Sequence, residues 1–402
     1  MSNTQKKNVP ELRFPGFEGE YSLDIFGNLA TNKSDKFNPQ NENASIDIEL
    51  DCIEQNTGRL IKIYNSKEFS SQKNKFNPQN VLYGKLRPYL NKYYFTKKSG
   101  VCSSEIWVLK STKEDKLLNL FLYYFIQTKR YSDVASKSAG SKMPRADWGL
   151  IENIRVYFPE LCEQQKIGEF FSKLDRQIEL EEQNLELLQQ QKKCYMQKIF
   201  SQELRFKDDN GNDYPEWEEK KLGELSQIVR GASPRPIKDP KWFNKESDIG
   251  WLRISDVTDQ NGKIYHLEQK LSIEGQEKTR VLLTTHLLLS IAASIGKPVM
   301  NFVKTGVHDG FLIFLNPKFN IFFMYYWLDY FKEKWSKYGQ PGSQVNLNSE
   351  IVKSQTLNMP SNHEQEKVGL FFSRNEKLIE LQQEKIMYLK RRKQALILKM
   401  FI

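Results

Sequence analysis

The stretch Pro159-Glu-Leu-Cys-Glu-Gln-Gln-Lys-Ile-Gly-Glu-Phe-Phe-Ser172 occurs a second time in the chain, as Pro360-Ser-Asn-His-Glu-Gln-Glu-Lys-Val-Gly-Leu-Phe-Phe-Ser373. The two copies are 201 residues apart, align without a gap, and remain similar as far as Phe200 and Phe401. A repeat of this length indicates a duplicated structural unit. With 402 residues, the chain is also too long for one ordinary domain. We therefore expect two half-molecules of about 200 residues each.

Weaker similarities precede the two copies. Phe14-Pro-Gly-Phe-Glu18 is similar to Tyr214-Pro-Glu-Trp-Glu218, and Asn56-Thr-Gly-Arg-Leu60 is similar to Gln260-Asn-Gly-Lys-Ile264. These similarities predict that each half consists of a globular domain followed by a long helix. The expected boundaries are 1–158 for the first domain, 159–203 for the first helix, 204–359 for the second domain and 360–402 for the second helix.

Both helical segments carry apolar residues in alternating steps of four and three, sustained over more than four heptads. This period predicts a coiled-coil seam, which polar residues interrupt at a few positions. The expected seam residues, polar ones included, are Ile178, Glu181, Leu185, Leu188 and Lys192 in the first helix and Ile379, Gln382, Ile386, Leu389 and Lys393 in the second.

The polar interruptions suggest one way to pair the two helices. If the helices are antiparallel and paired residue numbers sum to 574, Glu181 meets Lys393 and Lys192 meets Gln382. This predicts an intramolecular antiparallel coiled coil whose buried polar layers fix the register. The alternative is two separate helices, each packed on its own domain.

Short β-like runs and aromatic-rich helices occur in both globular parts. Strand candidates are 81–83, 106–109, 287–291 and 311–315, and helix candidates are 117–131 and 321–338. The expected fold class is α+β: two domains of mixed sheet plus helices, joined by the two long helices in a pseudo-twofold repeat.

The composition narrows the class of protein. Charged residues make up 27% of the chain and apolar residues 39%, and no run of about 18 apolar residues could span a membrane. The N-terminus lacks a signal-peptide stretch. Four cysteines lie far apart and four histidines offer no metal spacing. We expect a cytoplasmic protein without structural disulfides or a metal site.

The net charge of +10 is concentrated in one segment. Between Arg59 and Lys98 there are ten Lys or Arg residues and one acidic residue, Glu68, which gives a net +9. Such a stripe is typical of a protein that binds the phosphate backbone of nucleic acid. A solvated, lysine-rich surface is the alternative interpretation.

The catalytic signatures of DNA-directed enzymes are missing from the sequence. Asn316-Pro-Lys-Phe319 has Lys where an amino-methyltransferase needs a second Pro, and no Gly-x-x-x-x-Gly-Lys-Ser/Thr phosphate loop occurs. Glu218-Glu-Lys220 downstream of Asp208 or Asp209 could mimic the carboxylate-lysine set of metal-dependent nucleases. It lies in a polar stretch between domains and matches by residue frequency alone. The sequence predicts a non-catalytic chain.

Several loops combine residues suited to DNA. Segment 84–94 interleaves cations with tyrosines, and 138–145 is rich in small residues, which allow close approach to a ligand. Arg reads guanine and Asn reads adenine, while Lys and Tyr contact phosphate. Segments 250–256, 294–297 and 339–344 are the counterparts in the second domain. Ordinary turns are the alternative. The candidate DNA-binding residues are Lys85, Arg87, Tyr89, Asn91, Lys92, Ser141, Lys142, Arg145, Arg253, Ser255, Lys297, Ser343 and Gln344.

The repeat and its motifs resemble the specificity subunit of type I restriction-modification systems. The resemblance covers essentially the whole chain and rests first on Pro-x-x-x-Glu-Gln-x-Lys-[Ile/Val]-Gly-x-Phe-Phe-Ser at 159–172 and 360–373. Leu82-Tyr-Gly-Lys-Leu-Arg-Pro-Tyr-Leu90 and Asp51-Cys-Ile-Glu-Gln-Asn-Thr-Gly-Arg59 are further similar motifs. The second domain departs from the pattern at 290–297, which lacks the Arg-Pro pair.

The resemblance implies a non-catalytic DNA-recognition subunit. Each domain would read one half of a bipartite, asymmetric site in double-stranded DNA, and the coiled coil would set the spacing between the halves. Two adenine-methylating modification subunits would dock along the helices, together with restriction subunits that translocate and cleave. S-adenosylmethionine, ATP and Mg²⁺ would be bound by these partners.

Two alternatives remain. One is a complete restriction enzyme with a hidden catalytic centre. The other is a structural dimerisation protein whose coiled coil carries two domains that do not bind DNA.

Overall fold

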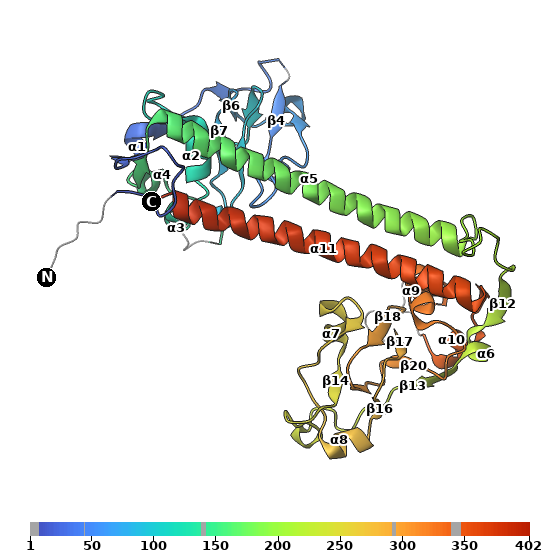
Figure 1. The fold of residues 1–402 in the computed structure, drawn as a ribbon. Helices are drawn as coiled ribbons and strands as arrows, with labels where there is room; N and C mark the ends of the chain where they lie inside the picture. Colours follow the sequence, from blue (N-terminus) through green and yellow to red (C-terminus); the bar gives the residue numbers. More distant parts are fainter. Residues whose placement is uncertain (1–7, 44, 138–141, 292–294, 339–346) are drawn as a thin grey trace. The chain divides into compact units, whose positions relative to one another are not determined.

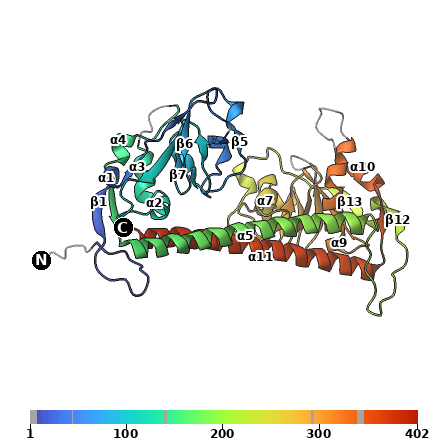
Figure 2. The same cartoon turned by 90° about the horizontal axis from the view of Figure 1, so that it is seen from above.

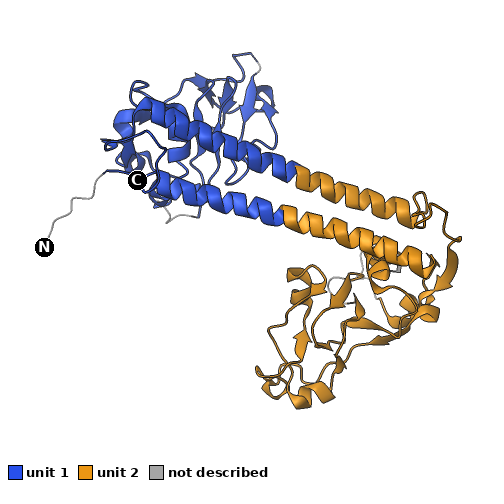
Figure 3. Cartoon of the chain, viewed as in Figure 1, with its two compact units in different colours: residues 1–183, 383–402 blue, residues 184–382 orange. Residues whose placement is uncertain are grey.

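The computed structural model describes residues 8–43, 45–137, 142–291, 295–338 and 347–402. The chain divides into two compact units, unit 1 (Met1–Gln183 with Gln383–Ile402) and unit 2 (Asn184–Gln382), as Figure 3 shows. Each unit contains one globular domain and one part of each of two long helices. No helix within the described ranges is long and apolar enough to cross a membrane.

The two long helices are α5 (Leu161–Phe200) and α11 (Asn362–Met400). At about 1.5 Å per residue, the 40 residues of α5 extend over about 60 Å. Within each unit, the α5 segment and the α11 segment lie side by side and run in opposite directions (Figures 1 and 2). The predicted antiparallel pairing is therefore confirmed.

A buried stripe follows both helices along the predicted seam. Its apolar part in unit 1 consists of Ile167, Phe171, Leu174, Ile178, Ile386, Leu389, Ile397 and Met400. Its apolar part in unit 2 consists of Met196, Ile199, Val368 and Phe372. Of the other expected seam residues, Gln382 and Lys393 are buried, and Glu181, Leu185, Leu188, Lys192 and Ile379 are half-buried.

Each unit has a polar layer in this seam that includes a tyrosine of the globular domain. In unit 1, Lys393 Nζ lies 2.7 Å from Asp175 Oδ1, and Tyr124 Oη donates a hydrogen bond to Asp175 Oδ2 at 3.0 Å. Because Tyr124 belongs to the globular domain, the layer joins the domain to both helices. The corresponding residues of the polar layer in unit 2 are Lys192, Glu376 and Tyr326.

The predicted register is wrong. Glu181 does not meet Lys393, and Lys192 does not meet Gln382; instead Glu181 Oε1 lies 2.6 Å from Lys385 Nζ. The paired residues of both polar layers sum to 568 rather than 574. The physical reason is that each seam lysine binds a carboxylate that a domain tyrosine also binds. Lys393 therefore binds Asp175 rather than Glu181, and Lys192 binds Glu376, which is a better partner for a buried ammonium than the amide of Gln382.

In the described part of the first domain there are three sheets, all in unit 1. β1 (Ser22–Ile25) pairs with β11 (Arg155–Phe158). The second sheet has the order β2 (Ala30–Thr31), β10 (Ile106–Ser111), β7 (Val81–Gly84), β8 (Tyr93–Phe95). The third has the order β3 (Lys36–Phe37), β6 (Lys73–Phe76), β9 (Gly100–Cys102), β4 (Ile46–Ile48), β5 (Tyr64–Asn65). β4 and β9 are parallel and their neighbours antiparallel, so the sheet is mixed as predicted.

The second domain repeats this plan in unit 2. β12 (Glu218–Lys221) pairs with β21 (Thr356–Met359). A five-stranded sheet has the order β13 (Gln227–Arg230), β20 (Phe311–Leu315), β17 (Leu287–Ser290), β18 (Pro298–Asn301), β15 (Lys263–Ile264). A three-stranded sheet has the order β14 (Gly250–Leu252), β19 (Thr305–Val307), β16 (Arg280–Leu282).

Short helices complete both domains. The first domain contains α1 (Phe26–Leu29), α2 (Asn119–Phe125), α3 (Lys129–Ala135), α4 (Trp148–Ile151) and the 3-10 turns η1 (Leu50–Cys52), η2 (Ser66–Glu68) and η3 (Pro88–Leu90). The second contains α6 (Leu222–Leu225), α7 (Ile254–Asp259), α8 (Ile273–Glu277), α9 (Ile321–Phe331), α10 (Ser349–Ser354), η4 (Pro240–Trp242) and η5 (Lys332–Tyr338).

Aromatic residues of α2 and α9 join each domain to the long helices. The helix predicted over 117–131 is interrupted, because the Thr128 side chain accepts a hydrogen bond from Tyr131 N and caps α3 as a separate helix. The ring centroids of Phe121 and Phe401 are 4.9 Å apart. In unit 2, Phe323 packs edge-on against Phe200. One hydrophobic cluster of each domain is thus continuous with the seam of its helix segments.

The repeated Glu-Gln motif attaches the start of each long helix to its domain. Glu163 is fully buried and pairs with Arg13 at 2.7 Å, which compensates the cost of burying its charge. The Gln164 amide donates to Pro159 O at 2.8 Å and accepts from Leu118 N at 2.9 Å. The second copy makes the same contacts with Glu364, Arg205, Gln365, Pro360 and Asn320.

Candidate nucleic-acid interface

The loop that follows β7 has an unusual backbone. Arg87 has φ 53° and Asn91 has φ 45°, and these two left-handed residues flank η3. Residues other than glycine seldom adopt this conformation, so the surrounding structure must hold it in place. Arg87 is exposed, Tyr89 is 57% exposed, and Lys85 and Asn91 are half-buried. The loop therefore presents Arg87 and Tyr89 to solvent.

A second predicted segment packs against this loop. Arg87 N donates a hydrogen bond to Pro144 O at 2.7 Å, and Lys142 is exposed two residues before that proline. The structure thus brings together two segments that are far apart in the sequence. We call residues 84–92 and 142–146 the first loop cluster.

The cations of the first loop cluster differ in whether their side chains are free to contact DNA. Arg145 forms two hydrogen bonds with Glu105, at 2.9 and 3.0 Å, and these bonds lower the pKa of Glu105. Lys92 Nζ donates to Leu50 O at 2.5 Å. Arg87 makes no side-chain hydrogen bond or ion pair with any other described residue. Its guanidinium is therefore available for a base edge or a phosphate.

The basic stripe at 59–98 presents less net positive charge in the folded protein than a count over its sequence suggests. Four of its ten cations form ion pairs with acids that lie outside the segment, so a count over 59–98 overstates the charge that DNA would meet. The paired cations are Arg59 (with Glu54 and Glu182), Lys62 (with Asp51), Lys73 (with Asp47 and Glu49) and Lys75 (with Glu42).

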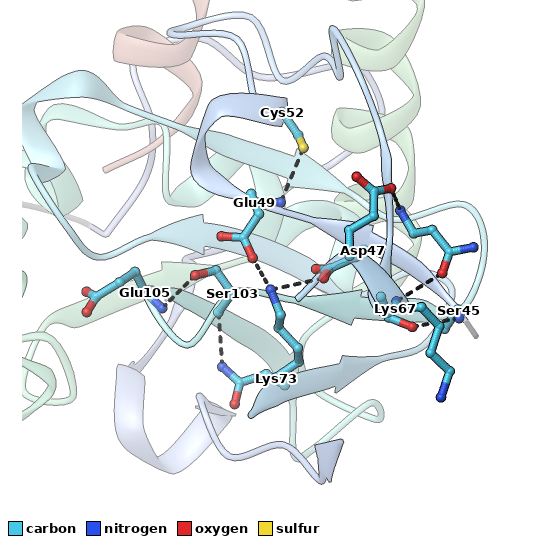
Figure 4. A network of polar contacts seen from close by, with 12 residues as sticks. Ser45, Asp47, Glu49, Cys52, Lys67, Lys73, Ser103 and Glu105 are labelled. Carbon is cyan, nitrogen blue, oxygen red and sulfur yellow. Dashed lines mark hydrogen bonds and ion pairs between the residues drawn. The ribbon is translucent and has the colours of Figure 1, made fainter. Parts of the chain in front are cut away.

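Lys73 belongs to a buried ionic network (Figure 4). Its side chain is 1% exposed, its Nζ lies 2.9 Å from Asp47 Oδ2, and it also pairs with Glu49. Burial raises the pKa of Asp47, against the opposing effect of Lys73. The network connects β4 with β6 across β9 and so stabilises the sheet of the first domain. This role is structural.

In the second domain, the predicted residues are largely engaged in local structure. Asp256 accepts a hydrogen bond from Arg253 N at 2.8 Å and pairs with its guanidinium at 2.9 Å, which caps α7. Lys297 Nζ donates to Asn261 Oδ1 at 3.2 Å, and burial lowers the pKa of Lys297. Ser255 is exposed in the first turn of α7. Ser141 of the first domain and Ser343 and Gln344 of the second lie outside the described residues.

The structure also shows a cationic group that sequence reasoning missed. Arg235 is 70% exposed and pairs with Asp309 at 2.7 Å, and Arg230 Nε donates to Asp309 O at 2.6 Å. Burial lowers the pKa of the neighbouring His308. Because 74 residues or more separate these arginines from their partner, no local spacing in the sequence indicates the group.

The residues considered for a nuclease centre serve local structure. Asp208 accepts hydrogen bonds from Asn210 N and Asn212 N, and Glu218 pairs with Lys220 at 2.8 Å. Among the described residues, no group of three His, Cys, Asp or Glu side chains could hold a metal ion.

Comparison with known protein families adds a second kind of evidence. The family described as "type I restriction modification DNA specificity domain" matches residues 20–190 and 214–391. The type I restriction enzyme MjaVIII specificity subunit of Methanocaldococcus jannaschii is 26% identical over 310 residues, which cover 72% of this chain and 71% of that protein. The EcoDI specificity subunit of Escherichia coli is 25% identical over 169 residues, 40% of this chain and 37% of that protein.

Solved structures share the fold. A chain from a study of complex assembly and conformational transition of the type I R-M system has a TM-score of 0.61 at 17% identity, covering 94% of this chain and 96% of that one. The S subunit of a type I restriction-modification system from M. genitalium has a TM-score of 0.57 at 14% identity, covering 98% and 99%. The HsdS subunit from Thermoanaerobacter tengcongensis has a TM-score of 0.51 at 17% identity, covering 97% of each.

Proposed function

Because the chain belongs to the type I restriction-modification DNA specificity family, we propose that each of its domains reads one half of a bipartite, asymmetric site in double-stranded DNA. The chain is a specificity subunit, a non-catalytic component of such a system. The observation that carries the proposal is the duplication: the family model matches twice, and each match contains one complete domain.

In the first domain, we assign DNA reading to the first loop cluster. The guanidinium of Arg87, which has no side-chain partner among the described residues, can contact guanine through two hydrogen bonds, which is the commonest specific contact in the major groove. Tyr89 and Lys142 are exposed beside it and suit phosphate. In the second domain, Ser255 and Arg235 are the exposed candidates.

The coiled coil would fix the gap between the two half-sites. Both long helices continue without interruption from one unit into the other, and neither contains Gly or Pro after Gly168 or Gly369. If the paired helices resist bending, the number of helical residues between the two domains would set the distance between the two half-sites. We expect half-sites about one helical turn apart or slightly more.

The long helices also offer surfaces for the other subunits. Large apolar side chains are exposed at equivalent positions of the repeat: Leu180 (48%) with Leu381 (49%), and Leu187 (56%) with Tyr388 (62%). Exposed apolar groups of this kind mark interaction sites. The repeat would supply two like surfaces for two like modification subunits. These subunits and the restriction subunits would bind S-adenosylmethionine, ATP and Mg²⁺.

The test is to co-express the chain with its modification subunit and map methylated adenines by single-molecule sequencing. We expect one bipartite motif that requires this chain. Arg87→Ala should reduce methylation about 10-fold and relax one position of one half, since a good base contact contributes about 1–3 kcal/mol. Lys113→Ala, at an exposed lysine outside the first loop cluster, is the matched control. A complex without bipartite methylation, or equal effects of the two variants, would contradict the proposal.

A further inference from the structure

Each domain touches the long helices through a left-handed turn as well as through its aromatic helix. Turn 1 (residues 54–60) contains Gly58 at φ 71°, and turn 2 (residues 260–264) contains Gly262 at φ 82°. These are the segments Asn56–Leu60 and Gln260–Ile264 whose similarity is visible in the sequence. The two turns are therefore equivalent features of the repeat.

Each turn lies directly against a buried tyrosine. A Cβ atom added at Gly58 would lie 1.9 Å from Tyr123 Oη, and one at Gly262 would lie 2.7 Å from a backbone oxygen and 3.3 Å from Tyr325 Oη. Tyr325 Oη donates a hydrogen bond to Asn261 O at 3.3 Å. Only glycine permits an approach this close at positive φ. The backbone of each turn is thus held in a fixed place on its aromatic helix.

The residue after each glycine is a cation that reaches a long helix. Arg59 Nη1 lies 2.5 Å from Glu182 Oε2 on α5, and Lys263 Nζ lies 2.5 Å from Glu376 Oε2 on α11. The Lys263 and Glu376 side chains are only 14% and 11% exposed. Glu182 is shared with Lys390 at 2.7 Å. Partial burial makes such pairs stronger than ion pairs in open solvent.

The ion pair gives the first domain a second polar attachment to the coiled coil. Tyr124 holds Asp175, and Arg59 holds Glu182, seven residues further along α5 and about 10 Å away. Two separated attachments resist rotation of the domain on its helices better than one. In unit 2, the tyrosine and the cation both bind Glu376, so the two attachments coincide.

We propose that Arg59 and Lys263 are positioning residues, which set the angle of each recognition domain on its part of the coiled coil and thereby make methylation depend on the gap between the half-sites. This inference rests on the proposed function. One base pair more or less moves a half-site by about 3.4 Å and turns it by about 35°. A domain that has lost one of its attachments can rotate far enough to follow part of this shift of its half-site. Its aromatic core meanwhile keeps it folded and attached to the helices. The effect is larger for Arg59, because only in unit 1 are the attachments apart.

The experiment uses the complex of the full chain with its modification subunits. Initial methylation rates are measured on DNA with unchanged half-sites and a gap of the native length or of one base pair more or less. The measured quantity is the ratio of the methylation rate at the native gap to the rate at an altered gap. We expect Arg59→Gln to lower this ratio about tenfold and Lys263→Gln to lower it about threefold. Methylation at the native gap should fall less than threefold, with unchanged bases in both halves. Arg59→Lys, which keeps the charge, should restore most of the ratio.

Matched controls separate gap discrimination from general loss of stability. Lys75→Gln and Lys304→Gln each remove a cation whose partner, Glu42 or Asp248, belongs to the same domain, and both should leave the ratio unchanged. An unchanged ratio in Arg59→Gln with an intact complex, or an equal loss of rate at every gap, overturns the inference. If the wild-type complex methylates no bipartite site, the proposed function fails instead, and the two failures are distinguishable.

Discussion

Replacement of Glu376 tests whether the polar layers stabilise the coiled coil. Glu376 lies between two cations, with Lys192 Nζ at 3.1 Å and Lys263 Nζ at 2.5 Å, and it accepts a hydrogen bond from Tyr326 Oη at 2.7 Å. Glu376→Gln keeps the shape of the side chain and removes the only charge that these interactions share. Both ammonium groups then remain in a largely buried site without that carboxylate.

The expected cost follows from this geometry. Removing one partner of a buried ion pair costs about 3–5 kcal/mol, and we take about 3 kcal/mol because Glu376 is 11% exposed. Asp175→Asn is the matched variant in unit 1. Asp175 is 25% exposed and its layer contains one cation, Lys393, so about 1–2 kcal/mol is expected. For units of this size, 1 kcal/mol corresponds to about 2–4 °C in Tm.

Thermal unfolding of the full chain at pH 7, followed by circular dichroism, measures both variants. Glu376→Gln should lower the Tm of the transition it affects by about 6–12 °C, and Asp175→Asn by about 2–8 °C. Burial opposes ionisation of Glu376, but Lys192 and Lys263 hold its pKa below the ordinary value of 4.5. A depressed pKa contributes stability that is present above pH 4.5 and is lost as the pH falls through the folded-state pKa. The difference between wild type and Glu376→Gln should therefore shrink below pH 4.5. A shift under 3 °C at pH 7, or a difference that does not change with pH, would refute the reasoning.

Two further predictions concern turn 1 and the thiols. Gly58→Ala should lower the Tm of the chain well beyond the effect of the control Gly211→Ala. Both glycines have positive φ, but only the methyl group added at Gly58 meets another atom, Tyr123 Oη. Equal shifts in Tm would show that the close approach is unimportant. With a thiol-specific reagent under native conditions, exposed Cys162 and Cys194 should react, while burial raises the pKa of both Cys52 and Cys102 and protects them. Rapid reaction of all four thiols would contradict the buried positions.

The seam of the coiled coil was predictable from the sequence, but its register was not. The 3.5-residue period identifies which face of each helix is buried, and this is a local property of the chain. The register depends on which acid each seam lysine binds. For Lys393 that acid is Asp175, which lies one residue away from the apolar period, whereas Glu181 lies on the period and was predicted as the partner. The choice is made by Tyr124 of the globular domain, which no pattern within the helices reveals.

The candidate DNA-binding residues show the same limit more strongly. Lys73 and Arg87 belong to one basic segment and look alike in a charge count, yet Lys73 is buried against Asp47 and Arg87 is exposed and unpaired among the described residues. The acids that pair with cations of the segment all lie outside it, in loops as well as in strands and helices, and one of them is Glu182 on α5. A window of sequence gives the sum of its own charges, whereas the field at a surface depends on every group that folding brings near it.

The similarity between the two halves of the sequence is highest where residues make buried contacts and lowest where loops face solvent. Glu163 and Gln164 recur unchanged as Glu364 and Gln365, and both copies make the same buried contacts. A loop such as that around Arg87 presents side chains to solvent. The rest of the fold restricts the backbone conformation of this loop but not the identity of its exposed side chains. Such a loop can change its residues without disturbing the attachment of the domain to the helices. Turn 1 and turn 2 are intermediate: both keep the glycine and a following cation, but that cation binds α5 in one unit and α11 in the other. If these turns set the angle of each domain, the two domains differ in how strictly their attachment restricts the gap between the half-sites. This difference is a property of the turns and the long helices, and it does not depend on which bases the loops read.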